Sequence, residues 1–207
     1  KPFSQDRTAL KTQIDGLQPR AGTSIFLGMK WAAAMLDPSF RDINNSLVSA
    51  GAVDNQFYGR PVDYDDPETL KTVILMTDGE NAASNRIASY YYDSDSEVVH
   101  WDKYNLNWYL YNYVSSWNRS SFYWRKYDRS LGNSLLSNIC TAAKAKRIVI
   151  WTIGFEVTDD PYNNNDGADV MRNCASSPSH FFDVDGVELS EAFKAIARQI
   201  NQLRLIQ

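Results

Sequence analysis

The chain has 207 residues, of which 43% are hydrophobic, and this length and composition suit one globular domain with a single sizeable core. Its 21 basic and 25 acidic side chains give a net charge of −4, and no dense basic cluster occurs, which argues against nucleic acid as a partner. No apolar run approaches the roughly 20 residues needed to cross a bilayer, and the first residues do not form a signal peptide. We therefore expect any export signal or membrane anchor to lie outside this chain.

The first third of the chain predicts two helices. Residues 4–17 are expected to form an amphipathic helix, with Ser4 as a possible N-cap. Its apolar side chains share one face: Leu10, Ile14 and Leu17. A second helix is expected over 23–36, which is rich in alanine and large apolar residues and is stopped by an Asp-Pro pair. Thr23 would then lie at or near the N-terminus of this second helix.

The rest of the chain predicts alternating strands and helices. Two continuous apolar runs, Thr72–Thr77 and Arg147–Phe155, have the composition of strands that are buried on both faces of a parallel sheet. A third, shorter strand is expected at Phe181–Val184. Helices are expected between and after these strands, at 131–145, 169–175 and 189–205, the last with Ser190 as a possible N-cap. This alternation indicates a parallel α/β sheet with right-handed crossovers.

One stretch, 82–133, interrupts this alternation and is interpreted as an insertion. It holds 14 of the 27 aromatic residues, mixed with serine, asparagine and aspartate. Three interpretations stay open: a satellite hydrophobic cluster, a protein-binding surface, and a stacking platform for carbohydrate. Within it, Asp93–Glu97 is expected to be a solvated loop. The aromatic residues expected to bind a partner are Tyr91, Trp101, Trp108, Tyr111, Trp117 and Trp124.

Two local signals could carry chemistry. The strand over 72–77 delivers Asp78 and a glycine to its carboxyl end, which is where ligands bind in open α/β sheets, although Asp-Gly is also a common turn dipeptide. The second signal is Gly22-Thr23 at the start of a helix, where the threonine hydroxyl could cap the helix or bind a hard cation. The order of the two signals, about 50 residues apart, favours a joint function.

This combination resembles the von Willebrand factor A family, whose metal site combines an Asp-x-Ser-x-Ser loop, a threonine on a second loop and an aspartate on a third. Thr23 matches the second element and Asp78 the third. The resemblance runs from about Leu10 to Leu203 and implies a three-layer, Rossmann-like fold with a mainly parallel sheet, forming one partial domain over 1–207. It also implies a divalent cation, magnesium or manganese with calcium as an alternative, because all three suit oxygen ligands.

The first element of the family's metal site is not found in this chain. No Asp-x-Ser-x-Ser sequence precedes Thr23. Since that motif follows the first, central strand in the family, we expect the N-terminal strands of the domain to be missing from this chain. A segment that carries the motif is accordingly an expected partner, and the cation is expected only when that segment is present.

The last third resembles the bacterial TadG-like proteins of pilus assembly more closely. The matching stretches are 140–155, 171–176, 182–185 and 189–197. By themselves, Cys140 and Cys174 have the wrong spacing for a CxxC motif and leave either one disulfide or two buried thiols. The resemblance implies a disulfide between two helices beside the sheet, and a location in the bacterial cell envelope, on the periplasmic or extracellular side.

These observations predict a binding, adhesion or pilus-assembly module and not an enzyme. Its expected partner is a protein, such as a pilus or envelope component. A metal-dependent hydrolase that uses Asp78 is one alternative, although Met76 and Glu80 do not reproduce the Asp-x-Asp of haloacid dehalogenase phosphatases. The other alternative is a metal-free scaffold that binds through the aromatic insertion.

Overall fold

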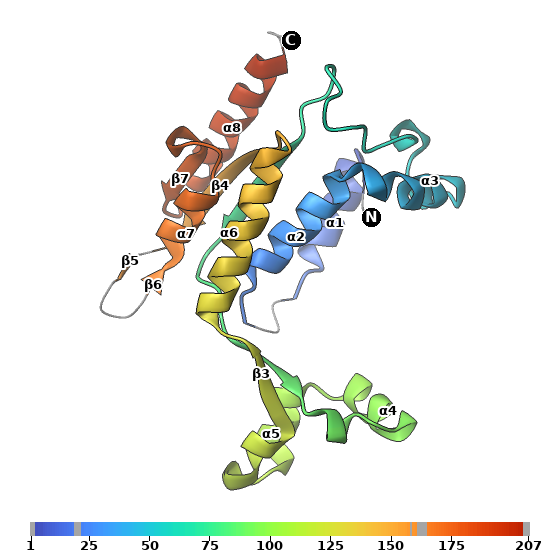
Figure 1. The fold of residues 1–207 in the computed structure, drawn as a ribbon, viewed down its shortest axis with the longest axis vertical. Helices are drawn as coiled ribbons and strands as arrows, with labels where there is room; N and C mark the ends of the chain where they lie inside the picture. Colours follow the sequence, from blue (N-terminus) through green and yellow to red (C-terminus); the bar gives the residue numbers. More distant parts are fainter. Residues whose placement is uncertain (1–2, 19–21, 158, 161–164, 205–207) are drawn as a thin grey trace.

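The computed structural model describes residues 3–18, 22–157, 159–160 and 165–204. Its centre is a parallel three-stranded sheet with the order β1-β4-β7, and helices pack on both faces of this sheet (Figure 1). The strands are β1 (Thr72–Thr77), β4 (Val149–Phe155) and β7 (Phe181–Val184). The predicted α/β class and parallel sheet are therefore confirmed, and two of the three strands have the predicted bounds.

The helices divide between the two faces of the sheet. One face is covered by α2 (Ile25–Leu36), α6 (Arg129–Ala145) and α7 (Gly167–Cys174), whose apolar residues form a core with Val73, Leu75 and Ile150. The other face is covered by α8 (Leu189–Arg204), which packs on Trp151 and Ile153. Two further helices, α1 (Arg7–Asp15) and α3 (Arg41–Ser49), lie before β1 in the chain. These layers correspond to the predicted three-layer architecture.

Burial differs between the two long strands. In β4 the side chains of Ile150, Trp151 and Ile153 are fully buried, as the continuous apolar run predicts. In β1 the prediction of burial on both faces was wrong. Ile74 and Met76 are 42% and 41% exposed, because β1 pairs with β4 on one side and α8 does not extend over its outer face.

Two predicted helix caps were also wrong. Asp6, and not Ser4, caps α1, because its carboxylate accepts hydrogen bonds from the backbone N–H groups of Thr8 and Ala9 at 2.9 and 3.0 Å. At the other end of the chain α8 already begins at Leu189, so Ser190 lies inside its first turn.

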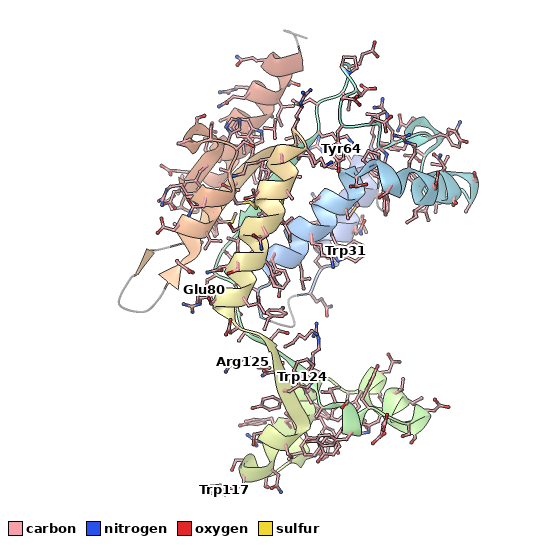
Figure 2. All side chains as sticks on the ribbon, viewed as in Figure 1. Trp31, Tyr64, Glu80, Trp117, Trp124 and Arg125 are labelled. Carbon is pink, nitrogen blue, oxygen red and sulfur yellow. A yellow bond between two sulfur atoms is a disulfide. The ribbon has the colours of Figure 1, made fainter. Side chains whose placement is uncertain are left out.

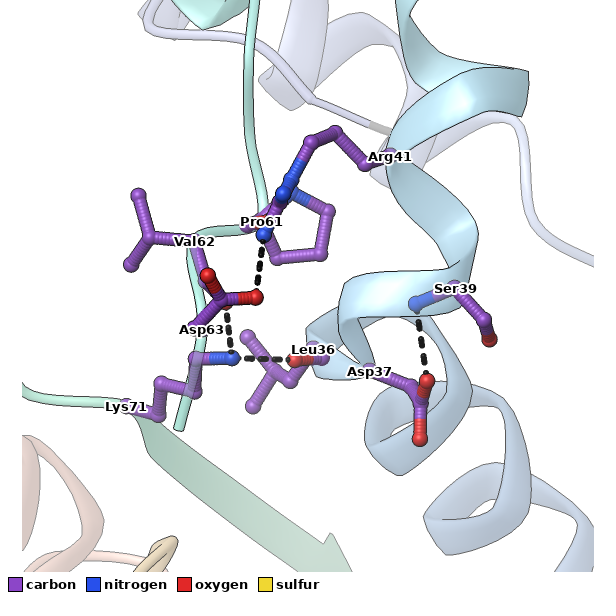
Figure 3. A network of polar contacts seen from close by, with 8 residues as sticks. All are labelled: Leu36, Asp37, Ser39, Arg41, Pro61, Val62, Asp63 and Lys71. Atoms are coloured by element: carbon purple, nitrogen blue, oxygen red, sulfur yellow. Dashed lines mark hydrogen bonds and ion pairs between the residues drawn. The ribbon is translucent and has the colours of Figure 1, made fainter. Parts of the chain in front are cut away.

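A polar network fixes the connection between α2 and β1 (Figure 3). Lys71 is 7% exposed, and its Nζ donates hydrogen bonds to the backbone oxygens of Leu36 at 2.7 Å and Val62 at 2.6 Å. The same Nζ lies 4.2 Å from the centre of the Tyr64 ring. Burial lowers the pKa of Lys71, while burial and a hydrogen bond to Asp37 raise the pKa of Tyr64 to about 12.

The aromatic insertion forms an arm that projects away from the α/β layers (Figure 1). We use "the arm" for residues 84–127. Its stalk is an antiparallel ribbon of β2 (Ser84–Ile87) and β3 (Tyr123–Tyr127), and its helices are α4 (Asp95–Lys103) and α5 (Leu106–Tyr113). Residues 129–133 of the predicted insertion belong to α6.

The sequence predicted a solvated loop at Asp93–Glu97, and this prediction was wrong because the stretch forms the start of α4. Ser94 caps α4 in a capping box, in which its hydroxyl accepts from the N–H of Glu97 and the Glu97 carboxylate accepts from the N–H of Ser94. The Ser94 hydroxyl also donates to the Glu97 carboxylate at 2.7 Å, and this bond, together with those from the backbone N–H groups of Asp93 and Ser94, lowers the pKa of Glu97. The carboxylates of this stretch therefore stabilise a helix N-terminus.

A disulfide joins Cys140 of α6 to Cys174 of α7, so the bond that the resemblance implied is present. Two short strands, β5 (Asp159–Asp160) and β6 (Asn165–Asp166), lead into α7. Among the helices of the described ranges, none is both long and apolar enough to span a membrane.

Candidate metal-binding site

The third predicted element of the site lies where β1 ends. Asp78 follows the last residue of β1 and its side chain is exposed. The turn is closed by Thr77, whose hydroxyl hydrogen-bonds to the N–H and to the C=O of Gly79, each at 3.2 Å. The strand and this turn therefore hold the Asp78 carboxylate at the carboxyl edge of the sheet, the edge at which α/β proteins bind ligands.

The second predicted element lies against this turn. The backbone C=O of Thr23 accepts a hydrogen bond from the N–H of Ala82 at 2.9 Å. The Thr23 hydroxyl oxygen is 4.0 Å from the position that a Cβ at Gly79 would occupy. The two loops that the sequence singled out, 55 positions apart, are thus in direct contact, and Thr23 precedes the N-cap residue of α2 by one position.

A buried amide chain behind the two loops was not anticipated from the sequence. Asn81 is fully buried, and its Oδ1 accepts from the N–H of Ile25, at the start of α2, at 2.8 Å. Its Nδ2 donates to Oδ1 of Asn133 at 2.9 Å, and Nδ2 of Asn133 donates to Oδ2 of Asp166 at 2.5 Å. Asn81 therefore connects the N-termini of α2, α6 and α7 through side chains.

The close approach of Asn81 to α6 depends on a glycine. A Cβ at Gly132 would lie 3.0 Å from Cβ and 3.2 Å from Cγ of Asn81, which is closer than ordinary van der Waals contact. Beside it, Glu80 forms an ion pair with Arg129 in the first turn of α6, and the second Glu80 carboxylate oxygen is buried without a hydrogen bond. Figure 2 places Glu80 at this end of α6, above the arm.

The arm begins directly beside the site. Tyr127, the last residue of β3, is buried, packs edge-on against Phe26 with ring centres 4.9 Å apart, and hydrogen-bonds through its hydroxyl to Ser24. Phe26 and Ser24 belong to the start of α2, immediately after Thr23. The base of the arm, the Thr23 loop and the Asp78 turn therefore form one connected region.

The donor chemistry of this region fits part of a divalent-cation site. A threonine hydroxyl and an aspartate carboxylate are the hard oxygen ligands that magnesium, manganese and calcium prefer. Within the described ranges neither side chain makes a hydrogen bond, which leaves both available as ligands. In the same ranges no group of three or more His, Cys, Asp or Glu side chains could hold a metal, so further ligands would have to come from elsewhere.

The six aromatic residues predicted to bind a partner separate into two groups in the arm. Tyr91 stacks on Phe122 with ring centres 4.2 Å apart, and Trp101 donates its Nε1–H to the backbone oxygen of Tyr91 at 2.6 Å. These two pack the interior of the arm. The other four are 48–90% exposed: Trp108, Tyr111, Trp117 and Trp124. Figure 2 shows Trp117 at the far end of the arm and Trp124 on the stalk.

Comparison with known proteins addresses the fold. No family model matches the chain, and no curated protein matches it. The structure is similar to the crystal structure of the vWF domain of the type V pili tip protein Mfa5 from Porphyromonas gingivalis, with a TM-score of 0.53 over 96% of this chain and 74% of that chain. The fold is that of a von Willebrand A domain. Sequence identity is 18%, so this similarity concerns the von Willebrand A fold and not the ligands of the site.

Proposed function

We propose that the chain is a non-enzymatic binding module of the von Willebrand A type, in which Thr23 and Asp78 belong to a metal-dependent adhesion site. The single observation that carries this proposal is the contact between the Thr23 loop and the Gly79 turn at the carboxyl edge of the sheet. The Thr23 hydroxyl would hold the cation directly or through water, and Asp78 would orient the ligands around it. A bound divalent cation supplies an open coordination position for a carboxylate of a partner protein.

The remaining ligands would come from a segment with the Asp-x-Ser-x-Ser pattern, paired with the edge of β1 that has no neighbouring strand within the described residues. Two features support such a neighbour. Ile74 and Met76 remain 42% and 41% exposed on a strand whose other face is buried, and a cavity of about 790 Å³ lies beside the start of β1. The side chains of Phe3, Leu36 and Ile200 contribute to its walls. An added parallel strand would cover these apolar groups and remove the open edge.

A location in the bacterial cell envelope, on the periplasmic or extracellular side, is part of this proposal. The Cys140–Cys174 disulfide supports an oxidising compartment, and the structural similarity to a pilus tip protein supports an adhesion or pilus-assembly function. The finer relationship to TadG-like proteins rests on the sequence resemblance alone.

The test uses material that carries this chain together with its Asp-x-Ser-x-Ser segment, identified by intact mass. Thermal unfolding is recorded with millimolar Mn²⁺ or Mg²⁺ and again with excess chelator. We expect the cation to raise the melting temperature, because an ion that binds only the folded protein stabilises it by mass action. The same chain without the segment should respond weakly or not at all. An equal response in both samples, or in neither, would contradict the proposed site.

A metal-free scaffold that binds through the arm is the second candidate, and the four exposed aromatic side chains favour it. The hydrolase alternative has a direct test. Turnover of a generic phosphate ester that is abolished by Asp78→Asn would favour that alternative over a binding module.

A further inference from the structure

The arm contains a cavity of about 500 Å³ between β2, α4 and the start of α5. Its apolar walls are formed by Ile87, Val98, Trp101 and Leu106, and Arg86 and Asp102 contribute charges. Both charged side chains are exposed, and within the described residues neither forms an ion pair. The cavity therefore combines an apolar interior with one available positive and one available negative charge.

The cavity lies along the open edge of a strand. Three consecutive residues of β2, Asn85 to Ile87, line it, although consecutive side chains of a strand point to opposite faces. Contact with all three indicates a cavity at the edge of the ribbon and not over one face. On its other side β2 pairs with β3, and within the described residues the ribbon has these two strands.

The hydrogen-bond pattern identifies which backbone groups of β2 face this edge. The N–H of Ala88 donates to the C=O of Phe122 at 2.8 Å, so the pair 88 and 122 is hydrogen-bonded across the ribbon. In an antiparallel ladder such pairs alternate with pairs whose backbone groups point outward. Since the register pairs Ile87 with Tyr123 and Asn85 with Arg125, the N–H and C=O groups of Asn85 and Ile87 point to the open edge.

We propose that this edge and cavity bind an extended segment of a partner polypeptide, which adds a strand to β2. The backbone groups of Asn85 and Ile87 would pair with the segment, and one apolar side chain of the segment would enter the cavity beside Val98 and Trp101. Arg86 and Asp102 favour an acidic and a basic residue on either side of that apolar residue. This interaction is independent of the cation at Thr23 and Asp78.

A backbone is a better match for this surface than a sugar is. Strand addition uses the outward amide groups, whereas sugar binding uses exposed ring faces. The most exposed ring of the arm, Trp117 at 90%, is not part of the cavity, while Trp101, which lines it, is held inside the arm by its hydrogen bond to Tyr91.

The test uses the 207-residue chain and a set of end-capped, eight-residue peptides with alternating threonines. One central residue is phenylalanine, leucine or serine, and its neighbours on the same face are glutamate and lysine. We expect the phenylalanine or leucine peptide to bind about tenfold more tightly than the serine peptide, because the apolar side chain is buried. Hydrogen exchange should slow at Asn85 and Ile87, and chelator should not change the affinity.

Two pairs of matched variants separate the mode of binding from loss of folding. Asn85→Pro removes an outward N–H at the cavity edge and should reduce affinity at least about tenfold, while Arg125→Pro makes the same change at the opposite edge of the ribbon and should not. Val98→Asp places a charge in the cavity and should abolish binding. Val99→Asp, one residue further along α4, should not, since Val99 is 68% exposed and does not line the cavity.

The proposal is overturned if no peptide of the set binds at millimolar concentration, or if binding leaves exchange at Asn85 and Ile87 unchanged. Equal affinities within either pair of variants would also overturn it. If neutral oligosaccharides bind instead, and protect residues around Tyr111 and Trp117, the arm is a carbohydrate platform and strand addition is wrong.

Discussion

Replacing Gly132 with alanine tests whether Asn81 needs close contact with α6. Gly28 provides a matched control, because both glycines are the fourth residue of their helices, Gly132 in α6 and Gly28 in α2. A Cβ at Gly28 would meet no atom within 4 Å, whereas a Cβ at Gly132 would lie 3.0 Å from the Asn81 Cβ. The added methyl group would therefore meet no neighbour at Gly28, whereas at Gly132 it would be in close contact with Asn81.

The expected magnitudes follow from these contacts. Alanine in place of glycine inside a helix stabilises by about 1 kcal/mol, which should be the whole effect of Gly28→Ala. At Gly132 the same gain is opposed by overpacking, at about 1–3 kcal/mol. Asn81 is fully buried and held by two hydrogen bonds, so its displacement would cost about 1 kcal/mol more. The two variants should then differ by about 2–4 kcal/mol.

Urea unfolding of the wild type and both variants measures this difference directly. We expect the Gly28→Ala midpoint to rise and the Gly132→Ala midpoint to fall, with unchanged slopes. If Gly132→Ala stabilises the chain as much as Gly28→Ala does, then Asn81 is free to move and the buried amide chain does not fix the site loops.

Two further changes test the framework around the site. Removing the disulfide by Cys140→Ala with Cys174→Ala should destabilise the fold by about 3–4 kcal/mol, because the bond restricts the unfolded chain between cysteines 34 positions apart. A urea midpoint equal to that of the wild type would contradict a stabilising role for the disulfide. The raised pKa of Tyr64, about 12 because of burial and its hydrogen bond to Asp37, stabilises the fold below pH 10 and loses this effect as pH rises towards 12. The free energy of unfolding of Tyr64→Phe should therefore fall less steeply than that of the wild type between pH 10 and pH 12. Lys71 is present in both proteins, so its titration does not cause the difference. Parallel pH profiles of the two proteins would show that the Tyr64 phenol titrates normally in the fold.

Much of the fold could be predicted because its strands are continuous apolar runs. The bounds of β1 and β7 follow directly from their sequences, since a short run of branched and aromatic residues next to turn residues suits a buried strand. Burial itself could not be derived in this way. Ile74 and Trp151 occupy paired positions in equally apolar strands, yet one is exposed and the other buried, because burial depends on which helix covers each position.

The candidate site could be predicted only as far as local sequence defines its two loops. Thr23 and Asp78 each stand beside a recognisable turn or helix start, and their order carries the family resemblance. Asn81 and Asn133 have no such signal, because Asn81 hydrogen-bonds to residues 56 positions before it and 52 positions after it. Local sequence does not distinguish a buried asparagine from one in an exposed loop, because the hydrogen-bond partners of the buried one are distant in the sequence.

The arm shows the same limit for aromatic residues. Composition indicated a binding surface, but it could not separate Tyr91 and Trp101, which pack the interior, from Trp117, which is exposed. Nor could it indicate the cavity beside β2, whose walls come from β2, α4 and α5, which the folded arm brings together.

Direct measurement of Mn²⁺ binding tests the central claim most closely. Electron paramagnetic resonance measures the concentration of free Mn²⁺ while the ion is titrated into the protein together with its Asp-x-Ser-x-Ser segment. We predict that Thr23→Ala and Asp78→Ala each weaken binding about tenfold or more, as the loss of one ligand or its support should. The control Asp65→Ala, an exposed carboxylate before β1 and so at the opposite end of that strand, should bind like wild type. Equal Mn²⁺ affinity in all four proteins would contradict a metal-dependent adhesion site at Thr23 and Asp78.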